Sequence, residues 1–455
     1  MKKCFYLVSA IILLPILCSQ CSEAPNWDDE GNANPPGAVS NPIVKNINGG
    51  AVIFYTLPPD NETNLLGVKA LYTRYDDGEI LEAYSSSHTD SIVVFGFPDT
   101  KERKVTLIAF NSSKKESQPV EVTINPLIPP HELIRNSMEV SETFSGVLVK
   151  WDNPSRAEIG VMLFAEDSLG FMNLDYTYFT GESGHYAFRG FDDTERKFRV
   201  VIRDRWDNES TPFDVVLSPL FEEDVVARDP ATGQTSWIRY GYTDQTTLWR
   251  GDYPGVYGSN AFYRMFDGIR TDAGYFHPGL AATYNLSFFT GNAEDAPILP
   301  KPFCVTIDMT RETKLSRYKF CCRNGTTTLN ENDPYHLRIW ASNETPKGPE
   351  DFNNDKMASL AYWTTWPQVG GTGAYQDDWT LVGECFVIPP SGALEGFQWT
   401  ADDRIWYQAG VEFDFFSEHS NTPFRYLRIE CIDNLKYTEL THFHEWEIYG
   451  SCRID

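Results

Sequence analysis

Basic residues are scarce in this sequence. Its 455 residues include 38 Lys and Arg against 64 Asp and Glu, which gives a formal net charge of −26. Binding to nucleic acid needs Lys and Arg to neutralise phosphates, and adsorption to anionic lipid needs the same side chains. The charge balance therefore disfavours both kinds of partner, and we expect no binding to nucleic acid.

Long apolar runs and catalytic signatures are also lacking. One apolar stretch runs from Phe5 to Leu17, so a polytopic membrane protein is excluded. The chain has no Gly-x-Ser-x-Gly, no His-Glu-x-x-His and no glycine-rich phosphate loop. Acidic pairs such as Asp402-Asp403 are expected in so acidic a chain, and they argue only weakly for acid–base catalysis. We therefore predict that the protein is not an enzyme.

The beginning of the chain has the pattern of an export signal. Lys2-Lys3 precede the apolar stretch, which is too short for a comfortable membrane span, so residues 1–20 are predicted to be a signal peptide. The acidic segment after Cys21 resembles the export signal of bacterial surface lipoproteins. This resemblance implies lipidation at Cys21, with Cys18 as the alternative, and a surface-exposed anchor in the outer membrane. An ordinary cleaved signal with incidental cysteines is the other interpretation.

Most of the remaining chain alternates between strand-like runs and turn clusters. Residues 21–37 are rich in Asn, Pro, Gly and acid, which predicts a flexible tether. Short runs enriched in Val, Ile, Tyr and Phe follow, among them Ala51–Leu57 and Phe198–Arg203. Such runs predict all-β domains, and no long capped amphipathic helix is evident.

An internal repeat organises the first half. Gly96–Leu127 and Gly190–Leu220 share Gly-Phe-x-Asp-Thr, Glu-Ser-x-Pro and a closing Pro-Leu, at offsets of 94, 93 and 93 residues. A unit of about 90 residues has the size of a small β-sandwich, so we predict modules at 38–127 and 128–220. The copies resemble fibronectin type III modules, more specifically those of lipoproteins encoded beside outer-membrane glycan importers.

Residues 221–455 form a different block. The segments Pro423–Ile429 (PFRYLRI) and Glu445–Gly450 (EWEIYG) resemble the coagulation-factor type C, or discoidin-like, jelly roll. Insertions at 344–356 and 363–380 depart from a compact member of that family. The predicted fold class is therefore all-β, with two tandem β-sandwich modules followed by a discoidin-like β-sandwich jelly roll.

Aromatic residues suggest where a ligand could bind. A sugar offers flat C–H faces to aromatic rings and hydroxyls to polar side chains, so a glycan site needs exposed rings on loops. Packing of the rings beneath long loops is the alternative. The Arg-Gly-Asp tripeptide at 250–252 is interpreted as accidental. The candidate ligand-binding rings are Trp249, Tyr253, Tyr257, Trp363, Trp366, Tyr375 and Trp379.

A metal site is implied by the resemblance to the discoidin-like family. Its sugar modules often hold calcium between an early Asp-Gly loop and a terminal Glu, and the matching positions are Asp267 and Glu445. Asp272 could join from the same loop, since carboxylate oxygens suit calcium. One structural calcium ion is therefore an expectation.

The cysteines beyond the tether all lie in the C-terminal block. An exported protein permits disulfides, and six cysteines allow fifteen full pairings. Buried free thiols are an equal alternative. The six are Cys304, Cys321, Cys322, Cys385, Cys431 and Cys452.

These features together predict a non-catalytic, carbohydrate-binding surface lipoprotein that captures a polysaccharide or oligosaccharide. The resemblance implies that it works beside a TonB-dependent importer and its partner lipoprotein, and that it contacts the membrane only through its lipid. The alternatives are cell adhesion, through binding of a host or matrix protein, and an accessory subunit of a glycan-degrading enzyme.

Overall fold

The computed structural model describes most of the chain beyond the predicted tether. Cys18, Cys21 and the signal peptide at 1–20 lie outside the described residues. Of Phe276–Leu280 only the backbone is described. In this part of the chain no helix is long and apolar enough to cross a membrane. The described residues are 34–59, 64–76, 78–226, 228, 231, 235–244, 246–252, 262–270, 276–280, 300–321, 333–393, 398–435 and 440–454.

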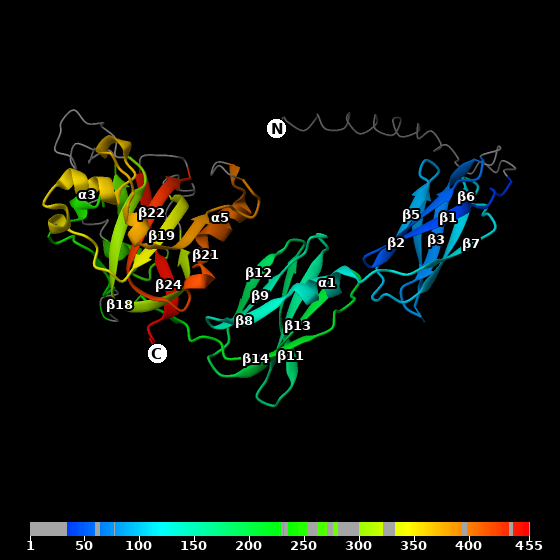
Figure 1. The fold of residues 1–455 in the computed structure, drawn as a ribbon, viewed down its shortest axis with the longest axis horizontal. Helices are drawn as coiled ribbons and strands as arrows, with labels where there is room; N and C mark the ends of the chain where they lie inside the picture. Colours follow the sequence, from blue (N-terminus) through cyan, green and yellow to red (C-terminus); the bar gives the residue numbers. More distant parts are fainter. Residues whose placement is uncertain are drawn as a thin grey trace, which may run out of the picture. The chain divides into compact units, whose positions relative to one another are not determined.

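Strands dominate the described chain, which confirms the all-β prediction (Figure 1). The chain divides into two compact units. The first comprises residues up to Val140, Leu148–Phe188 and Arg196–Leu217, and the second comprises Ser141–Val147, Arg189–Glu195 and Ser218–Asp455. The first unit therefore contains the junction between the two predicted modules.

The first module is a sandwich of two antiparallel sheets. Alternating burial along its strands, such as buried Ile53 beside exposed Phe54, turns one face of each sheet into a shared core. One sheet has the order β1 (Ser40–Ile47), β2 (Gly50–Thr56), β5 (Ser91–Phe95), and the other the order β4 (Ile80–Ser86), β3 (Leu65–Thr73), β6 (Arg103–Asn111), β7 (Val120–Ile124).

The second module repeats this topology strand for strand. The helix α1 (Pro130–Ser137) precedes it, with Pro130 at the first helical position, where a missing N–H costs nothing. One sheet has the order β12 (Gly184–Arg189), β9 (Gly146–Trp151), β8 (Glu139–Thr143), and the other the order β11 (Met172–Thr180), β10 (Ile159–Glu166), β13 (Arg196–Asp204), β14 (Phe213–Leu217).

Equivalent hydrogen bonds explain the repeated motifs. The N–H of Phe97, in the first Gly-Phe-x-Asp-Thr, donates to the carbonyl of Gly49 at 3.2 Å, and the N–H of Phe191 donates to that of Ser145 at 3.0 Å. Each motif therefore fastens the end of one strand to the turn after another.

The serines of the two Glu-Ser-x-Pro motifs also make equivalent hydrogen bonds in the two modules. The N–H of Ala109 donates to Ser117 Oγ at 3.0 Å, and the N–H of Ile202 donates to Ser210 Oγ at 3.0 Å. A buried side-chain oxygen thus completes the strand ladder where the returning strand turns away.

The C-terminal part is built around one long bent strand. The sheet has the order β15 (Glu223–Asp224), β24 (Trp446–Ser451), β18 (Phe303–Phe320), β22 (Pro423–Asn434), β19 (Pro334–Ser342), β20 (Thr380–Phe386), while β16 (Ile238–Arg239) and β21 (Val411–Asp414) also pair with β18, and β17 (Phe276–Leu280) pairs with β23 (Leu440–Phe443). β22 pairs with β18 on both sides of the register break at Asp308/Thr313, whereas β16 pairs with β18 before the break and β24 and β21 pair with it after the break.

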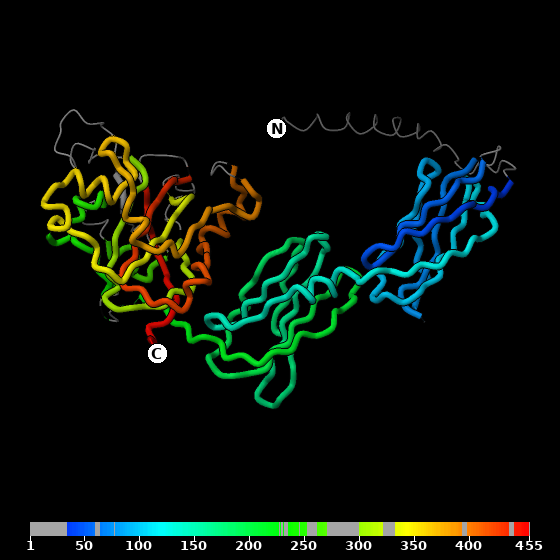
Figure 2. The backbone as a smooth tube through the Cα atoms, viewed as in Figure 1, coloured from blue at the N-terminus to red at the C-terminus, as the bar shows by residue number. Residues whose placement is uncertain are grey.

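Short helices connect these strands. The segment at 344–380 runs along the outside of the strands (yellow in Figure 2). The α-helices are α3 (Lys356–Trp363), α4 (Tyr375–Asp378) and α5 (Ala401–Gln408), and the 3-10 helices are η1 (Thr246–Trp249), η2 (Phe262–Met265), η3 (Pro349–Phe352), η4 (Pro367–Val369) and η6 (Ser417–His419).

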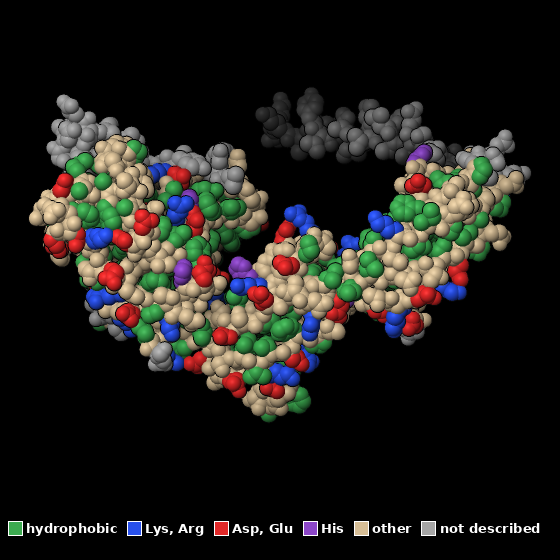
Figure 3. Space-filling model, viewed as in Figure 1, with side chains coloured by type: hydrophobic (Ala, Val, Ile, Leu, Met, Phe, Trp, Pro, Cys, Tyr) green, Lys and Arg blue, Asp and Glu red, His purple; other side chains and the backbone are tan. Residues whose placement is uncertain are grey.

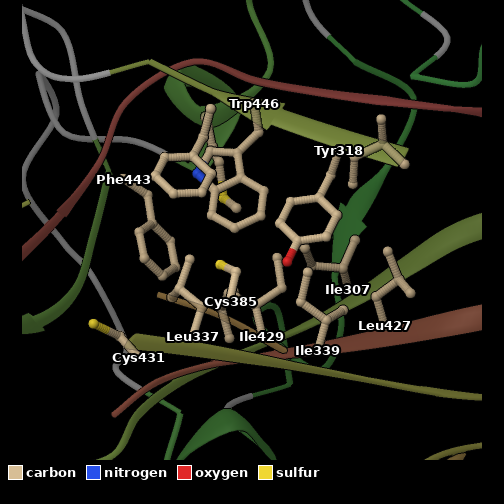
Figure 4. Packing of buried hydrophobic residues seen from close by; sticks show 14 of the residues in the cluster. Ile307, Tyr318, Leu337, Ile339, Cys385, Leu427, Ile429, Cys431, Phe443 and Trp446 are labelled. Atoms are coloured by element: carbon tan, nitrogen blue, oxygen red, sulfur yellow. The ribbon is translucent and has the colours of Figure 1, made fainter. Parts of the chain in front are cut away.

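The core of the C-terminal part is rich in aromatic rings. Tyr318 and Trp446 stack with their centroids 5.9 Å apart, and Figure 4 shows Cys385 beside them.

On the surface the two signs of charge are interspersed over the face seen in Figure 3. The net negative charge of the chain is therefore not gathered into one acidic field on that face.

Candidate functional site

Four of the seven aromatic side chains predicted to bind sugar lie in the protein interior. Trp363, Trp366 and Tyr375 have no exposed surface, and Trp379 is 7% exposed. The Trp363 ring stacks on Tyr375 at 5.5 Å and meets Trp379 edge-on at 5.9 Å. A ring covered by protein has no free face for a sugar. The prediction that these four rings contact a ligand is therefore wrong for this structure.

A buried arginine holds the inserted segment against the sheet. Arg428, on β22, donates from Nη1 to Asp252 Oδ1 at 2.7 Å and from Nη2 to the carbonyls of Arg250 and Trp363, at 3.1 and 2.9 Å. Its guanidinium also lies 4.9 Å from the centroid of the Tyr375 ring. A buried charge is tolerated only when it is paired and hydrogen-bonded, so these partners must fold over it.

The other predicted aromatic stretch is only partly described. Tyr253 and Tyr257 lie outside the described residues. Trp249, at the end of η1, is half-buried, and its carbonyl accepts a hydrogen bond from Ser359 Oγ at 2.7 Å. A ligand-binding role for these three residues stays a prediction.

The Arg-Gly-Asp tripeptide lies inside the protein. Arg250 and Asp252 have no exposed surface. Arg250 Nη2 donates to the carbonyl of Tyr240 at 2.8 Å, and Asp252 accepts from Arg428. A receptor in solution reaches neither charged side chain, so the tripeptide serves packing in this fold.

The predicted calcium position does bring the early Asp-Gly loop to the terminal Glu. The N–H of Gly268 donates to Glu445 Oε2 at 2.9 Å, and Arg228 Nη2 donates to Oε1 at 2.9 Å. Asp267 Oδ2 accepts from Arg264 Nη1 at 3.2 Å. Each carboxylate is therefore already paired with an arginine, which supplies the positive charge that an ion would bring.

These donors do not by themselves fit a calcium ion, which takes six to eight oxygen ligands. Among the described residues no group of three or more His, Cys, Asp or Glu forms a metal site. Burial raises the pKa of Glu445 to about 8, and Asp267 adds to the shift, whereas Arg228 and the Gly268 N–H oppose it. Asp272 lies outside the described residues, so the calcium ion stays a prediction.

The five described C-terminal cysteines are free thiols; Cys322 lies outside the described residues. Cys304, Cys321, Cys385 and Cys431 are buried, whereas Cys452 is half-buried. Burial raises the pKa values of Cys385 and Cys431 to about 12. Of the two alternatives, the structure shows free thiols for these five residues.

A cavity of about 460 Å³ lies in the first compact unit, where the first module meets the second. Ligand pockets usually enclose roughly 300–1,000 Å³ and are lined by aromatic and a few polar groups. The walls of this cavity include Phe95, Gly96, Pro129, Glu158, Arg205 and Trp206. We call it the junction cavity.

The partly exposed rings of Phe95 and Trp206 form part of the apolar wall of the junction cavity, which also includes Ile47, Phe97, Pro129 and Pro130. Phe95, at the end of β5, is 38% exposed, and Trp206, after β13, is half-buried. The rings are nearly parallel, 22° apart, with centroids separated by 6.4 Å. The Arg205 guanidinium lies 4.3 Å from the centroid of the Trp206 ring. Its N–H groups therefore bring hydrogen-bond donors to the border of the junction cavity.

The turn that carries Trp206 is held rigidly. Asp204 Oδ1 accepts from the N–H groups of Trp206 and Asn208, at 2.8 and 2.9 Å, and its Oδ2 accepts from Asn208 Nδ2 at 2.8 Å. Burial alone would raise the pKa of Asp204, but His131, whose Nδ1 lies 3.4 Å from Asp204 Oδ2, and the hydrogen bonds from Asn208 outweigh it and lower the pKa below its usual value. The turn therefore keeps its shape as long as Asp204 is ionised.

Hydrogen bonds across the junction also fix the first module to this turn. Asn208 Nδ2 donates to the carbonyl of Gly96 at 3.1 Å, and Tyr75 Oη donates to Asn208 Oδ1 at 2.5 Å. A Cβ on Gly96 would lie 3.0 Å from Cδ2 of Trp206. The two modules thus approach so closely that the cavity wall is preformed.

The opposite wall is a loop organised by one buried asparagine. Asn153 Oδ1 accepts from the N–H of Ala157 at 3.0 Å, and its Nδ2 donates to the carbonyl of Ala157 at 2.8 Å. This closed pair of hydrogen bonds sets the backbone that presents Glu158. The cavity therefore has rigid walls on both sides.

The internal repeat provides a control for Trp206. The turn 111–115 in the first module matches 204–208 in the second: Lys114 and Asp207 both have a left-handed φ, at 58° and 63°. Ser113 occupies the position of Trp206. Since a serine suits the same turn, the fold does not require a tryptophan there, and this mismatch within the repeat is the signal that sequence reasoning missed.

Family models match three consecutive parts of the chain. Residues 36–126 match DUF4959, residues 127–228 match DUF5126 and residues 282–450 match DUF5000, each described as a domain of unknown function. No curated protein sequence matches the chain significantly.

Solved structures similar to this chain include a "SusE-like protein BT2857", with 19% identity over 71% of this chain and 99% of that one, at a TM-score of 0.37. A two-domain fibronectin type III segment of chicken tenascin has 12% identity over 40% and 99%, with a TM-score of 0.21. The FN1–FN3 domains of chicken CNTN1 have 11% identity over 69% and 83%, also at 0.21. These likenesses are too distant to assign a function.

Proposed function

We propose that the protein is a non-catalytic, carbohydrate-binding lipoprotein of a bacterial cell surface, and that it holds glycan in the junction cavity. The lipid would be carried by Cys21 in the outer membrane. In the setting implied by the sequence resemblance, the captured glycan would pass to a TonB-dependent importer and its partner lipoprotein.

The Phe95–Trp206 pair at the junction cavity carries this proposal. Sugar rings place C–H groups against aromatic surface, and their hydroxyls need charged or polar partners close by. Arg205 donates and Glu158 accepts at the same cavity, and both side chains are exposed. The rigid walls mean that little conformational entropy is lost on binding.

The chemistry of the cavity favours holding over reaction. Asp204 has the most buried carboxylate at its wall, but three N–H donors occupy its oxygens and its lowered pKa keeps it ionised. A general acid would instead need a raised pKa near the working pH. For the adhesin alternative, the buried Arg-Gly-Asp tripeptide provides no receptor-binding motif.

Affinity electrophoresis tests the proposal. The full chain after the predicted signal peptide would be run through gels containing neutral polysaccharides (laminarin, galactomannan, xyloglucan, arabinoxylan) and anionic ones (polygalacturonate, chondroitin sulfate). We expect retardation by at least one gel, lost in Phe95→Ala and Trp206→Ala. Phe171→Ala is the matched control, because Phe171 is exposed away from the cavity.

Two results would overturn the proposal: no retardation in any gel, or equal retardation of the wild-type chain and both cavity variants. Since Trp206 also packs at the junction, the melting temperature of each variant is measured as well. Arg205→Gln leaves both rings in place and provides a second, milder test, in which weaker retardation is expected.

A further inference from the structure

A second hollow adjoins the junction cavity. It has a volume of about 490 Å³ and shares Glu158, Asp204 and Arg205 with the junction cavity. Its far wall is Phe179, on β11, whose side chain is 68% exposed. We call it the Phe179 hollow. We call the three shared polar residues the polar ridge; Phe95 and Trp206 line the junction cavity, and Phe179 lines the second hollow.

The backbone is shaped to accommodate Phe179 in this position. Gly160 on β10 pairs with Phe179, and a Cβ on Gly160 would lie 3.2 Å from Cε1 of the ring. The absence of a side chain at Gly160 therefore leaves room for the ring beside the sheet.

The internal repeat again supplies a control. Gly67 in the first module pairs with Phe110 and Ser86, as Gly160 in the second pairs with Arg203 and Phe179. Ser86 thus occupies the position of Phe179. The first module folds with a small polar residue there, so a highly exposed phenylalanine is no requirement of the fold. Trp206 and Phe179, two of the aromatic residues that the second copy has where the first has none, line these adjoining hollows.

The charges around the two hollows are balanced. Three are positive and three negative: Arg156, Arg203 and Arg205 against Glu158, Asp204 and Asp207. Arg203 Nη1 lies 3.7 Å from Asp207 Oδ1, so part of this charge is paired internally. An anionic sugar meets no net positive site here, and the charge of −26 on the whole chain repels polyanions at long range.

We infer that the junction cavity and the Phe179 hollow form one extended site for a neutral oligosaccharide chain. One sugar lies in the junction cavity near Phe95 and Trp206, a later sugar lies on Phe179, and the hydroxyls between them bond to Glu158 and Arg205 on the ridge. This inference rests on the proposed function, because it defines the ligand of the same cavity.

Calorimetric titration with oligosaccharides of increasing length tests the inference. The probes are cello-, manno- and xylo-oligosaccharides of two to six residues, titrated into the full chain after the predicted signal peptide. We expect affinity to rise with length in one series. Phe179→Ala is expected to weaken binding of the longest member about tenfold, which is 1.4 kcal/mol, and to leave the shortest unchanged. Trp206→Ala should weaken both.

The outcomes separate the two proposals. Binding that is lost in Trp206→Ala but shows no length dependence and no effect of Phe179→Ala overturns the extended site and leaves the proposed function standing. Tighter binding of polygalacturonate than of every neutral glycan overturns the neutral ligand. No binding of any probe in gels or calorimetry overturns the proposed function and the extended site together. Leu174→Ala, an exposed change on the same strand away from both hollows, is the control.

Discussion

Trp206 lies against Phe95, with the ring centroids 6.4 Å apart and the ring planes 22° from parallel. The two rings come from different modules, so one contact both closes the junction and lines the cavity. The approach is so close that the neighbouring position, Gly96, has no room for a side chain.

Replacing Gly96 with alanine is expected to destabilise the first compact unit by roughly 2–4 kcal/mol. The new methyl group would lie 2.9 Å from Arg74 Cδ and 3.0 Å from Trp206 Cδ2, at a φ of +89°. Urea denaturation followed by tryptophan fluorescence measures the loss. Gly170→Ala is the control, because Gly170 has a φ of +86° but no atom near its Cβ position. It should cost only about 1–2 kcal/mol of backbone strain, and an equal cost at both sites would contradict crowding at the junction.

Arg428→Ala is expected to destabilise the C-terminal unit by roughly 3–5 kcal/mol. Removal of one partner leaves Asp252 as a buried, uncompensated charge. Scanning calorimetry would show the loss in the transition of that unit. Arg338→Ala provides the comparison, because the Arg338–Glu384 ion pair is partly exposed and is worth about 0–1 kcal/mol. Similar losses in the two variants would mean that Arg428 is not structurally central.

The raised pKa of Glu445 predicts a specific pH dependence of stability. In the unfolded chain this carboxyl loses its proton near pH 4.3, whereas in the folded protein its pKa is about 8. Between these values the folded state binds more protons, so the free energy of unfolding falls as pH rises, by on the order of 4 kcal/mol over the window. Glu445→Gln should remove this slope, measured by urea denaturation from pH 5 to 9. A slope unchanged in the variant would show that Arg228 keeps Glu445 ionised.

Calcium removal tests the metal site implied by the discoidin-like resemblance. If the predicted ion is bound, the melting temperature falls with chelator, recovers with added calcium and loses both responses in Glu445→Gln. Asp272 would then be the first residue to examine as a further ligand. A melting temperature that a chelator leaves unchanged would mean that Arg228 and the Gly268 N–H hold Glu445 without an ion.

The repeated modules could be predicted from sequence because their motifs are hydrogen-bonding devices at fixed places in the fold. Ser117 and Ser210 each accept a backbone hydrogen bond from an equivalent strand. Phe97 and Phe191 each follow a glycine, and their N–H groups make equivalent backbone hydrogen bonds in the two modules. Hydrogen bonds between residues of the same module require particular residues at fixed spacing. The resulting motif can therefore be recognised in the sequence.

The C-terminal aromatic rings were assigned wrongly for the opposite reason. Trp363 and Tyr375 lie in a segment with glycine and proline neighbours, which favoured an exposed loop. Their burial is determined by Arg428, which follows Trp363 by 65 residues and needs partners that close over it. Local composition does not encode such a long-range requirement. The junction cavity also escaped prediction, because its walls come from both modules.

The four buried thiols of the C-terminal unit have a consequence for how the protein reaches its folded state. With pKa values near 12, Cys385 and Cys431 carry almost no thiolate at neutral pH, and thiolate is the species that attacks disulfides. In the folded protein these two thiols therefore react poorly with disulfides, but the same sulfurs are accessible in the unfolded chain. In an oxidising compartment this core must fold faster than its cysteines form disulfides. The ratio of the folding rate to the rate of disulfide formation then determines the yield of native protein.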